Sequence, residues 1–544
     1  MRLKEHNSEK KLRGAYYTPE DLATAMVGLS GVGNAKTILE PSCGDGVFIE
    51  ALVECQELRH DVSIDAVEID GEALRKAQKI DCNEVSVSYR QGDFFEFYEH
   101  ARPGCYDLIL GNPPYIRYQY LEPEQRALLA DILNRQGMRA NKLVNAWVGF
   151  MVACTDLLAD GGTLSFVIPA EILQVVYAED LRRFLARHYS HITLFALSKL
   201  VFDDIEQEIV VFVGVKGSGK SAVRVIEADS VADLHNRSFG EVEYQPFVTF
   251  DEKWTRYFLN ARDAKVLNEL YQDERLVPFA KLARINVGVT TGNNSYFSLT
   301  DETSAKYNLD EFTLPLIGRS SHASGVFFTE EDWRQNRSQG KRARLLALED
   351  GQYKRMTKIQ RAYIDEGENR GENNGYKCSI RDSWSSVPSI WIPDAYFLRR
   401  NNLYPKLVLN RCGAISTDTM HRMKFRDGID PELAIIAYYN SIAFAFTELY
   451  GRSYGGGVLE ILPKEVGNIH VLNTGLLNIN AELKRNVISV IDGVVRNGRN
   501  IDEALDYVDA KILVGVLRFD EDTCRACRRI WKTLQARRLG RGTR

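Results

Sequence analysis

The segment that decides the fold is Tyr106-Asp107-Leu108-Ile109-Leu110-Gly111-Asn112-Pro113-Pro114-Tyr115. Residues 107–110 form a short apolar run that ends at a glycine and two prolines, which predicts a buried strand followed by a turn. Each proline ring fixes φ and removes an N–H donor, so the turn is stiff. Open α/β sheets bind their ligands at the carboxyl ends of the strands, and this turn lies at such an end. We therefore expect an α/β sheet with a binding loop at residues 112–115.

The loop offers two hydrogen-bond acceptors and one aromatic face. The acceptors are the side-chain oxygen of Asn112 and the carbonyl of Pro113, and Tyr115 supplies a surface for stacking. This combination suits a planar substrate that carries an exocyclic amino group. An ordinary Pro-Pro turn capped by Asn, with Pro114 as its second proline, has the same letters. The flanking sequence has to decide between the two interpretations.

A strand and a small-residue turn precede this loop. Residues 37–40 predict the strand, and a helix follows the turn from about residue 47. Glycines in such a turn let the backbone approach a ligand closely. The acids Glu40 and Asp45 would repel a pyrophosphate, so the turn disfavours a nicotinamide cofactor and suits a ligand with a positive centre and an amino-acid portion, such as S-adenosylmethionine. The candidate cofactor residues of this turn are Glu40, Pro41, Ser42, Cys43, Gly44, Asp45 and Gly46.

Two further strand ends carry acidic residues. One predicted strand ends at Glu68 and Ile69, about twenty residues after the glycines, where dinucleotide-type folds place a carboxylate that binds ribose hydroxyls. The next predicted strand leads to Asp93 and Phe94. We expect Glu68 to bind a ribose, Asp93 to accept from an adenine amino group and Phe94 to pack on the adenine face.

The chain enters this region through Tyr17-Thr18-Pro19. Apolar residues at helical spacing follow, so Thr18 is predicted to be the N-cap of a helix and Pro19 its first residue. Tyr17 and Thr18 have a second interpretation, in which they form an exposed loop with a hydroxyl beside a cofactor. These residues alone do not favour either interpretation.

Strands and helices alternate up to about residue 215. The predicted strands are 37–40, 63–70, 85–90, 107–110, 163–169, 192–197 and 208–213, with helices at 141–158 and 180–188 among the connections. About seven strands with intervening helices predict a doubly wound, Rossmann-like sheet that ends in a hairpin near residue 220. Residues 214–221 match the spacing of a P-loop, but residues 222–226 alternate like a strand, whereas a P-loop opens a helix. We therefore predict a Gly-Ser hairpin turn there.

From about residue 225 the regular alternation ends, and aromatic, polar and glycine-rich pieces follow. This texture predicts a mixed α+β region. Arg, Asn, Ser, Tyr and Gly in exposed loops contact base edges and phosphates, although the same residues also make ordinary turns. The charged residues 365–374 predict a flexible loop, and the chain from residue 477 predicts a helical end with a cationic tail.

Composition bounds the class of protein. The 544 residues suffice for about two to four domains, and no apolar stretch approaches the ~20 residues that cross a bilayer, so we expect no membrane partner. Nine scattered cysteines indicate reduced thiols and a cytoplasmic protein. Cys524-x-x-Cys527 lacks a second Cys or His pair nearby, so we expect no metal. The net charge of −5 argues against a protein that coats nucleic acid, but not against a basic cleft.

These signatures, in this order, resemble the gamma group of DNA adenine-N6 methyltransferases, the TaqI type, and its longer type II restriction–modification relatives. The resemblance is specific over residues 14–215 and looser beyond, where Thr291-Gly292-Asn293 and Gly455-Gly456-Gly457 look like features of recognition domains. The motifs that match are Tyr17-Thr18-Pro19, residues 40–46, Glu68, Asp93-Phe94 and residues 112–115. The family implies a catalytic methyltransferase domain over residues 1–222, a DNA target recognition domain over 223–475 and a helical C-terminal segment over 476–544.

The resemblance also implies roles and partners. Asn112 and Pro113 would accept the two hydrogens of an adenine amino group, and Tyr115 and Phe202 would stack on the extruded base. Asn112 would also contact the cofactor, S-adenosylmethionine. Double-stranded DNA would be the substrate, in the cytoplasm of a bacterial or archaeal cell, and a separately encoded restriction endonuclease is a possible partner.

Other functions share part of this pattern. Asn-Pro-Pro-Tyr also occurs in methyltransferases that act on RNA or on a protein glutamine amide, which present a similar planar amino or amide group. The large region after the catalytic domain favours DNA, because reading several base pairs needs a long surface. A catalytically silent DNA-binding specificity protein is disfavoured because every expected catalytic position is filled. No nuclease module is recognisable before residue 14 or after the recognition region.

Overall fold

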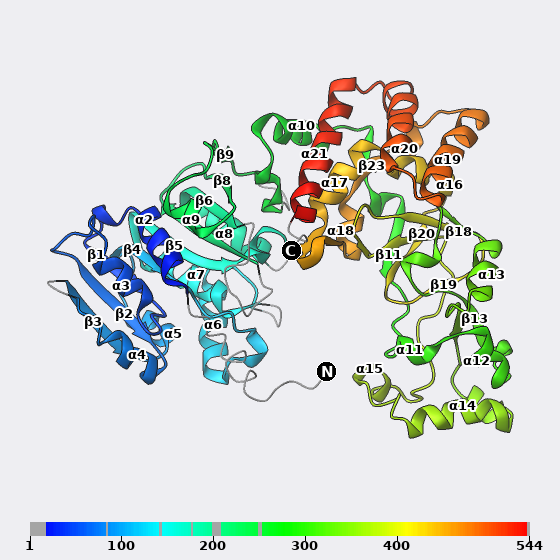
Figure 1. Cartoon of the computed structure of the whole chain (residues 1–544), viewed down its shortest axis with the longest axis horizontal. Helices are drawn as coiled ribbons and strands as arrows, with labels where there is room; N and C mark the ends of the chain where they lie inside the picture. The colour runs from blue at the N-terminus through cyan, green and yellow to red at the C-terminus, as the bar shows by residue number, and fades with distance from the viewer. Residues whose placement is uncertain are drawn as a thin grey trace. The chain divides into compact units, whose positions relative to one another are not determined.

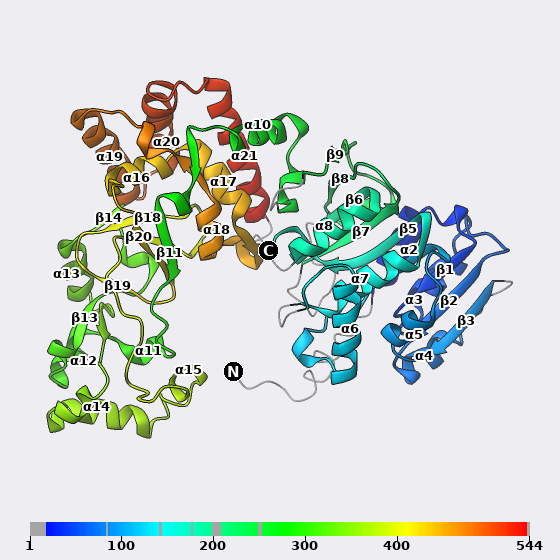
Figure 2. The ribbon, with the colours of Figure 1, turned by 180° about the vertical axis from the view of Figure 1, so that it is seen from behind.

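The computed structural model of the chain describes residues 18–82, 85–140, 144–175, 178–197, 208–248 and 253–540. The chain divides after residue 261 into two compact units. Figures 1 and 2 show the elements of both units from opposite sides. The three-segment division predicted from the sequence, with boundaries at residues 222 and 475, stays a prediction.

The first unit is built on one nine-stranded sheet with the order β3-β2-β1-β4-β5-β7-β6-β8-β9 (Figure 1). Neighbouring strands from β3 to β5 run parallel, and β1 has β2 on one side and β4 on the other. The strand order therefore reverses at β1, which is where sheets of this kind bind ligands. The predicted doubly wound α/β sheet is confirmed. The strands are β1 (Thr37–Glu40), β2 (Ser63–Glu68), β3 (Ser86–Gln91), β4 (Tyr106–Gly111), β5 (Leu158–Pro169), β6 (Tyr189–Leu197), β7 (Ile209–Lys216), β8 (Ala222–Ala228) and β9 (Gln245–Pro246).

Helices cover both faces of this sheet. In β4, Leu108 and Leu110 enter one hydrophobic core and Ile109 enters the other, as the alternation of a strand requires. Burial on both sides explains why the central strands read as nearly continuous apolar runs. The first core is covered by α2 (Glu20–Leu29), α3 (Val47–Val53) and α9 (Val231–His235), and the second by α5 (Phe94–His100), α6 (Pro123–Arg135), α7 (Ala146–Leu157) and α8 (Glu179–His188); α4 (Gly71–Ala77) packs on α3 and β2.

Strand β5 begins earlier than predicted, at Leu158 rather than at residue 163, and helix α7 begins later, at Ala146 rather than at residue 141. Helix α7 ends at Leu157 and β5 begins at the next residue, so Gly161 and Gly162 lie within the strand rather than between helix and strand. A Cβ on Gly162 would stand only 2.9 Å from the backbone oxygen of Asp107, so glycine here lets β5 approach β4 closely. The two glycines lie where the register between these strands shifts.

The predicted hairpin near residue 220 is wrong, although the strand after it is confirmed. Strand β7 lies between β5 and β6, and β8 pairs with β6 in parallel rather than with β7. The Gly-Ser segment therefore carries the chain past β6 to its far side. Because β8 follows it, no helix starts there, which agrees with the rejection of a P-loop. Alternation in sequence predicts a strand but cannot name its neighbour.

The second unit is mixed α+β, as predicted. Its sheets have the orders β11-β20-β16-β18-β14, β12-β15-β13-β19, β17-β22-β21 and β10-β23. Their strands are β10 (Leu276–Pro278), β11 (Ala283–Val287), β12 (Ser298–Leu299), β13 (Thr313–Ile317), β14 (Phe327–Phe328), β15 (Arg344–Leu346), β16 (Ala395–Leu398), β17 (Arg400–Asn401), β18 (Leu407–Asn410), β19 (Ile415–Ser416), β20 (Met420–Phe425), β21 (Arg452–Tyr454), β22 (Val458–Glu460) and β23 (His470–Leu472). The helices that accompany them are α10 (Ala261–Tyr271), α11 (Asn294–Phe297), α12 (Asp301–Lys306), α13 (Glu330–Ser338), α14 (Lys358–Asn369), α15 (Tyr376–Ser379), α16 (Pro431–Tyr438), α17 (Ser441–Tyr450) and α18 (Pro463–Asn468).

The flexible loop predicted at residues 365–374 is wrong over its first half. Helix α14 continues to Asn369, and Thr357 and Gln360 form a capping box at its start. Ile364 is buried, while Glu366 and Arg370 form an ion pair of 2.7 Å on the exposed side. The charges belong to the solvent face of an amphipathic helix, and composition alone hid that pattern.

The chain ends in the predicted helices α19 (Ala481–Arg496), α20 (Ile501–Val508) and α21 (Glu521–Gly540). Helix α21 packs along α17, and the buried Arg538 donates to the buried carboxylate of Glu448 at 2.5 Å. Cys524 and Cys527 are both buried on α21. Among the described residues, no helix is both long and apolar enough to span a membrane.

Candidate active site

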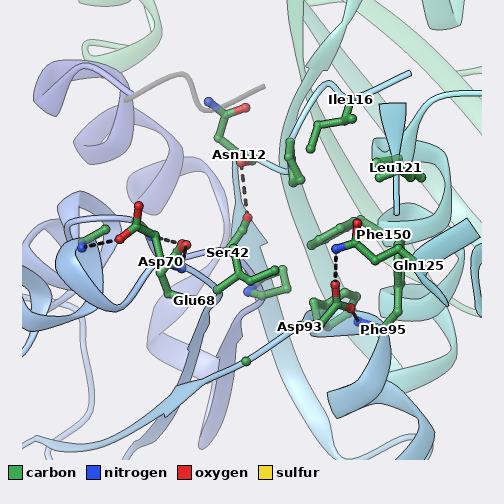
Figure 3. Close-up of a pocket in the computed structure, with 18 of the residues that line it drawn as sticks. Ser42, Glu68, Asp70, Asp93, Phe95, Asn112, Ile116, Leu121, Gln125 and Phe150 are labelled. Carbon is green, nitrogen blue, oxygen red and sulfur yellow. Dashed lines mark hydrogen bonds between the residues drawn. The ribbon is translucent and has the colours of Figure 1, made fainter. Parts of the chain in front are cut away.

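A pocket of about 590 Å³ opens at the carboxyl ends of β1, β2, β3 and β4 in the first unit (Figure 3). Glu68 and Asp70 lie on one side of it, and Phe150 and Gln125 lie on the other, with Asn112 at one end. It is lined by Pro41, Ser42, Gly44, Glu68, Ile69, Asp70, Gly71, Ala73, Gly92, Asp93, Phe94, Phe95, Asn112, Pro114, Ile116, Leu121, Gln125, Ala146 and Phe150. The four predicted strand-end motifs therefore meet in one cavity.

The predicted residues fall into three groups. Those that line the pocket are Pro41, Ser42, Gly44, Glu68, Ile69, Asp93, Phe94, Asn112 and Pro114. Those that stand behind or beside the lining are Thr18, Glu40, Cys43, Asp45, Gly46, Pro113 and Tyr115. Tyr17 and Phe202 lie outside the described residues. The individual roles assigned to all of these residues stay predictions.

Glu68 connects the turns after β1 and β2. Its two carboxylate oxygens accept hydrogen bonds from the backbone N–H of Gly44 and of Asp70, both at 2.8 Å. Each oxygen keeps a further lone pair, so the carboxylate can still accept from two neighbouring hydroxyl groups. The carboxylate is thus held in place at the pocket, as the prediction that it binds ribose hydroxyls requires.

The turn after β1 depends on Gly46. Gly46 has φ of +99°, and a Cβ there would stand 2.9 Å from the Cβ of Ala77 on α4. Only glycine combines that backbone conformation with so close an approach. The N–H of Cys43 donates to the carbonyl of Val67 at 2.9 Å, which fixes the turn to the end of β2.

Glu40 is fully buried at the end of β1, and neither carboxylate oxygen has a hydrogen-bond partner among the described residues. Burial raises its pKa well above the ordinary value, and the charges of Glu68 and Asp45 raise it further. A Cβ on Gly111 would stand 3.8 Å from Cγ of Glu40, so the carboxyl lies next to the residue that precedes Asn112. A buried carboxyl in this state favours a cationic neighbour.

Asn112 is fixed from both sides. Its side-chain Nδ2 donates to Oγ1 of Thr18 at 3.2 Å. Oγ of Ser42 donates to its backbone carbonyl at 3.3 Å (Figure 3). The prediction that Thr18 is a helix N-cap is wrong, because Pro19 takes the N-cap position and α2 begins at Glu20. The Thr18 hydroxyl instead sets the orientation of the Asn112 carboxamide. Its alternative interpretation, as a hydroxyl in a functional loop, fits this position.

Tyr115 lies partly buried beside the pocket. Its hydroxyl donates to the carbonyl of Val167 at the end of β5, at 3.1 Å, and its ring packs against the cores on both faces of the sheet. The ring is therefore held in place relative to Asn112. Whether a substrate stacks on it stays a prediction.

Asp93 has a structural task that the sequence analysis missed. One of its oxygens accepts from the N–H of Phe95 at 2.7 Å and caps α5, and the other accepts from Nε2 of Gln125 at 2.6 Å (Figure 3). The carboxylate thus joins α5 to α6 at the pocket wall. The signal for the cap was present, since an Asp before a helix is a frequent N-cap, but Gln125 lies in a helix that the sequence analysis did not single out.

The wall opposite Glu68 is aromatic and aliphatic. Phe94 stacks on Phe150 of α7 with ring centroids 4.5 Å apart, and Ile116 and Leu121 extend this surface. Ile69 lines the pocket with 60% of its surface exposed, which is unusual for isoleucine. These surfaces suit a flat apolar ring. Phe150, Ile116 and Leu121 come from the middle of a helix and from a loop, where no local motif marks them.

The charge of the pocket has one sign. Three carboxylates, those of Glu68, Asp70 and Asp93, are among the described lining residues, and no Lys or Arg is among them. The buried Glu40 stands behind them. This arrangement attracts a cationic ligand and repels a phosphate, as the sequence of the first turn predicted.

Two family models match the chain. Residues 51–202 match the Eco57I restriction-modification methylase, and residues 251–513 match the C-terminal domain of the Type II methyltransferase M.Eco57I. The chain belongs to the type II restriction–modification methyltransferases. The resemblance noted in the sequence is thereby confirmed for this class, and DNA methylation is the reaction class that the family supports.

Relatives of this methyltransferase support the assignment over the whole chain. It is 24% identical over 529 residues to the Type II methyltransferase M.AccI of Acinetobacter calcoaceticus, a match that covers 93% of each chain. It is 29% identical over 252 residues to M.HincII of Haemophilus influenzae, covering 45% of this chain and 46% of that protein. The fold is similar to that of the Type IIL restriction-modification enzyme MmeI, solved in complex with DNA, with a TM-score of 0.57, 11% identity and coverage of 95% of this chain and 75% of MmeI.

Proposed function

We propose that this methyltransferase transfers the methyl group of S-adenosylmethionine to N6 of an adenine that has left double-stranded DNA. The observation that carries the proposal is the fixed carboxamide of Asn112 at the end of the acidic pocket. Because its nitrogen donates to Thr18, the oxygen on the other side of the carboxamide is oriented as an acceptor. An exocyclic amino group is the donor that this acceptor and the adjacent Pro113 carbonyl fit.

The residues of the pocket fit S-adenosylmethionine. The three lining carboxylates and Glu40 suit its positive charges, Glu68 is placed to accept from ribose hydroxyls, and the wall around Phe94 suits its adenine ring. When bound, this cofactor supplies an activated methyl group on a positively charged sulfur. The chain then needs to orient the amine more than to deprotonate it, and orientation supplies much of the rate.

The substrate base has to leave the duplex to reach this loop. Extrusion costs a few kcal/mol, and stacking on an aromatic face contributes about 1–3 kcal/mol per base. Tyr115 is one such face, held by its bond to Val167. Asn112 and Pro113 then accept the two N6 hydrogens, which draws the nitrogen lone pair out of conjugation with the ring.

Methylation of RNA or of a glutamine amide would use the same loop, and a catalytically silent DNA-binding protein would share the fold. DNA is favoured because the second unit matches the C-terminal domain of a Type II methyltransferase and because M.AccI is similar over nearly its whole length. Such a unit offers the long surface that reading several base pairs needs. The function proposed here is compatible with a separately encoded restriction endonuclease as a partner.

The test is Asn112→Ala, measured as tritiated methyl incorporation into DNA that lacks prior methylation. Removing one preorganised hydrogen-bonding group typically lowers the rate by about 10²–10³-fold, and we expect a loss in this range without loss of DNA binding. Asn134→Ala, an exposed position on α6, is the matched control and keeps full activity. Mass spectrometry of the digested DNA identifies the product. Incorporation unchanged in Asn112→Ala, or methyl found on a base other than adenine, would refute the proposal.

A further inference from the structure

A second pocket, of about 490 Å³, lies within the second unit, at one end of its four-stranded sheet. It is formed where β13 and β19 end and β15 begins. We call it the basic pocket. Its lining comprises Asn294, Ser295, Ser298, Gly318, Arg319, Ser321, His322, Lys341, Arg342, Thr417 and Thr419. No role in the methyl transfer described above involves these residues.

Three cations line the basic pocket, and no carboxylate is among the described residues that line it. Lys341 donates to the side-chain oxygen of Asn336 at 2.8 Å, and Arg342 donates to the backbone carbonyl of Ser295. Both acceptors are neutral, so neither bond cancels the charge. Arg319 is exposed and has no ion-pair partner in the described part of the chain.

Two other arginines near the pocket, one on β15 and one on α13, do form ion pairs. Arg344 and Arg337 both pair with Asp301, at 2.7 and 2.8 Å. The three lining cations lack ion pairs among the described residues, in a chain whose net charge is −5. Uncompensated cations gathered in a concave site attract anions.

The buried His322 lines the basic pocket beside two of its cations. Its Nδ1 accepts from the N–H of Gly318 at 3.3 Å, and Asn336 donates to its backbone carbonyl. Burial, together with the charges of Lys341 and Arg319, lowers its pKa to about 4. The ring is therefore neutral at pH 7, with its second nitrogen as an N–H donor.

Hydroxyl groups complete the lining. Ser295, Ser321 and Thr419 are exposed at the pocket, and Thr419 donates to the carbonyl of Gly318 at 3.1 Å. Arg, Lys and hydroxyl side chains around one cavity are the groups that bind phosphate oxygens in protein–DNA complexes. A phosphate has only acceptors at neutral pH, which matches a site rich in donors.

We propose that the basic pocket binds a backbone phosphate of the DNA substrate, an inference that rests on the proposed function. Such a contact sets the position of the second unit along the duplex and carries no sequence information. The acidic pocket of the first unit, which we call the cofactor pocket, and the basic pocket then bind ligands of opposite charge. The first takes a cation and the second takes an anion.

The test is the salt dependence of duplex binding by the full-length double variant Arg319→Ala/Lys341→Ala. Loss of one neutralised phosphate makes the slope of log K against log salt shallower by about 0.9, and loss of a charged hydrogen bond weakens binding about tenfold at fixed salt. Both effects are equal for duplexes with and without the target sequence. Arg334→Ala is the control, because Arg334 is exposed on α13 and pairs with Glu330 at 2.6 Å.

A wild-type slope in the double variant would overturn the inference, and so would a loss restricted to the target sequence, which would mean base reading. Arg319→Ala alone repeats the test with a smaller structural change, since that side chain is exposed. Asn112→Ala separates the two proposals. If both proposals hold, Asn112→Ala lowers methyl incorporation by about 10²–10³-fold and keeps the wild-type slope. An unchanged slope in the double variant alongside adenine methylation by the wild type removes only the phosphate site.

Discussion

Two buried glutamates, one in each unit, have opposite surroundings. Glu40 lies at the end of β1 and has no hydrogen-bond partner among the described residues, and its neighbours Glu68 and Asp45 add to the effect of burial in raising its pKa. Glu448 on α17 is also buried, and burial raises its pKa as well, but the hydrogen bond and charge of Arg538 act in the other direction.

The difference separates a carboxyl whose partner the fold supplies from one whose partner, in the function proposed above, is a ligand. The fold provides the cation for Glu448, so that pair is complete without any ligand. It provides none for Glu40 in the described part of the chain, and leaving a carboxyl in that state costs free energy. Such a cost is retained in proteins at sites where a ligand supplies the missing partner.

The largest effect is expected from breaking the complete pair with Arg538→Met. Arg538 also donates to the carbonyls of Asn402, at 2.7 Å, and Gly457, so its loss strands an uncompensated carboxylate and two acceptors. We expect the free energy of unfolding of the second unit to fall by about 3–5 kcal/mol, measured from the denaturant midpoint. Glu448→Leu/Arg538→Met should recover most of it, because an apolar pair of similar volume replaces a buried ion pair at little cost. A double variant as unstable as the single one would show that the pair is not the cause.

The next effect concerns Glu68, the acid at the rim of the same pocket as Glu40. Glu68→Ala removes the carboxylate that we propose accepts from the ribose hydroxyls, and it releases the N–H groups of Gly44 and Asp70. We expect the dissociation constant for S-adenosylmethionine to rise by about 100-fold, since hydrogen bonds to charged groups contribute about 1.5–3 kcal/mol. Isothermal titration calorimetry measures it, with Glu72→Ala on the exposed side of α4 as the control. Unchanged affinity would remove Glu68 from the cofactor site.

Smaller effects are expected for Glu40→Gln, which should raise the stability of the fold and lower its affinity for S-adenosylmethionine. The pKa of Glu40 is higher in the folded chain than its ordinary value of 4.5, so the folded state binds more protons and stability falls as the pH rises from that value toward the folded pKa. Gln removes this penalty. The free energy of unfolding of the variant should be about 1 kcal/mol higher than that of the wild type at pH 8 and equal to it at pH 4. Its affinity for S-adenosylmethionine should fall, because the cation loses its partner. A stability difference that does not change with pH would contradict the argument.

The cofactor pocket was accessible from sequence because its parts are local. Glu40, Glu68, Asp93 and Asn112 each stand at the end of a strand, and parallel strands bring their carboxyl ends to one edge. Thr18, Gln125 and Phe150 were harder to place, because each takes its task from a partner far along the chain. The same limit explains the hairpin near residue 220, where the strand was predicted correctly and its neighbour was not.

In the second unit the residue types were informative but their positions were not. The sequence analysis named Arg and Ser in exposed loops as residue types that contact DNA, but Arg319 and Ser321 meet Lys341, Arg342 and Thr419 only through the pairing of β13 with β15 and β19. Helix α14 was missed because its charged residues outnumber the few apolar ones that mark its buried side. Short strands and irregular connections leave little periodicity to detect.

The contact between Thr18 and Asn112 has a consequence for which side chains the loop after β4 tolerates. A hydroxyl can give a proton or receive one, so Thr18 would donate to a carboxylate as readily as it accepts from an amide. Asn112→Asp would then keep an oxygen facing the substrate, while Thr18→Val would leave the amide free to turn over. Thr18 therefore allows either an amide or a carboxylate at position 112, although it lies 94 residues earlier in the chain.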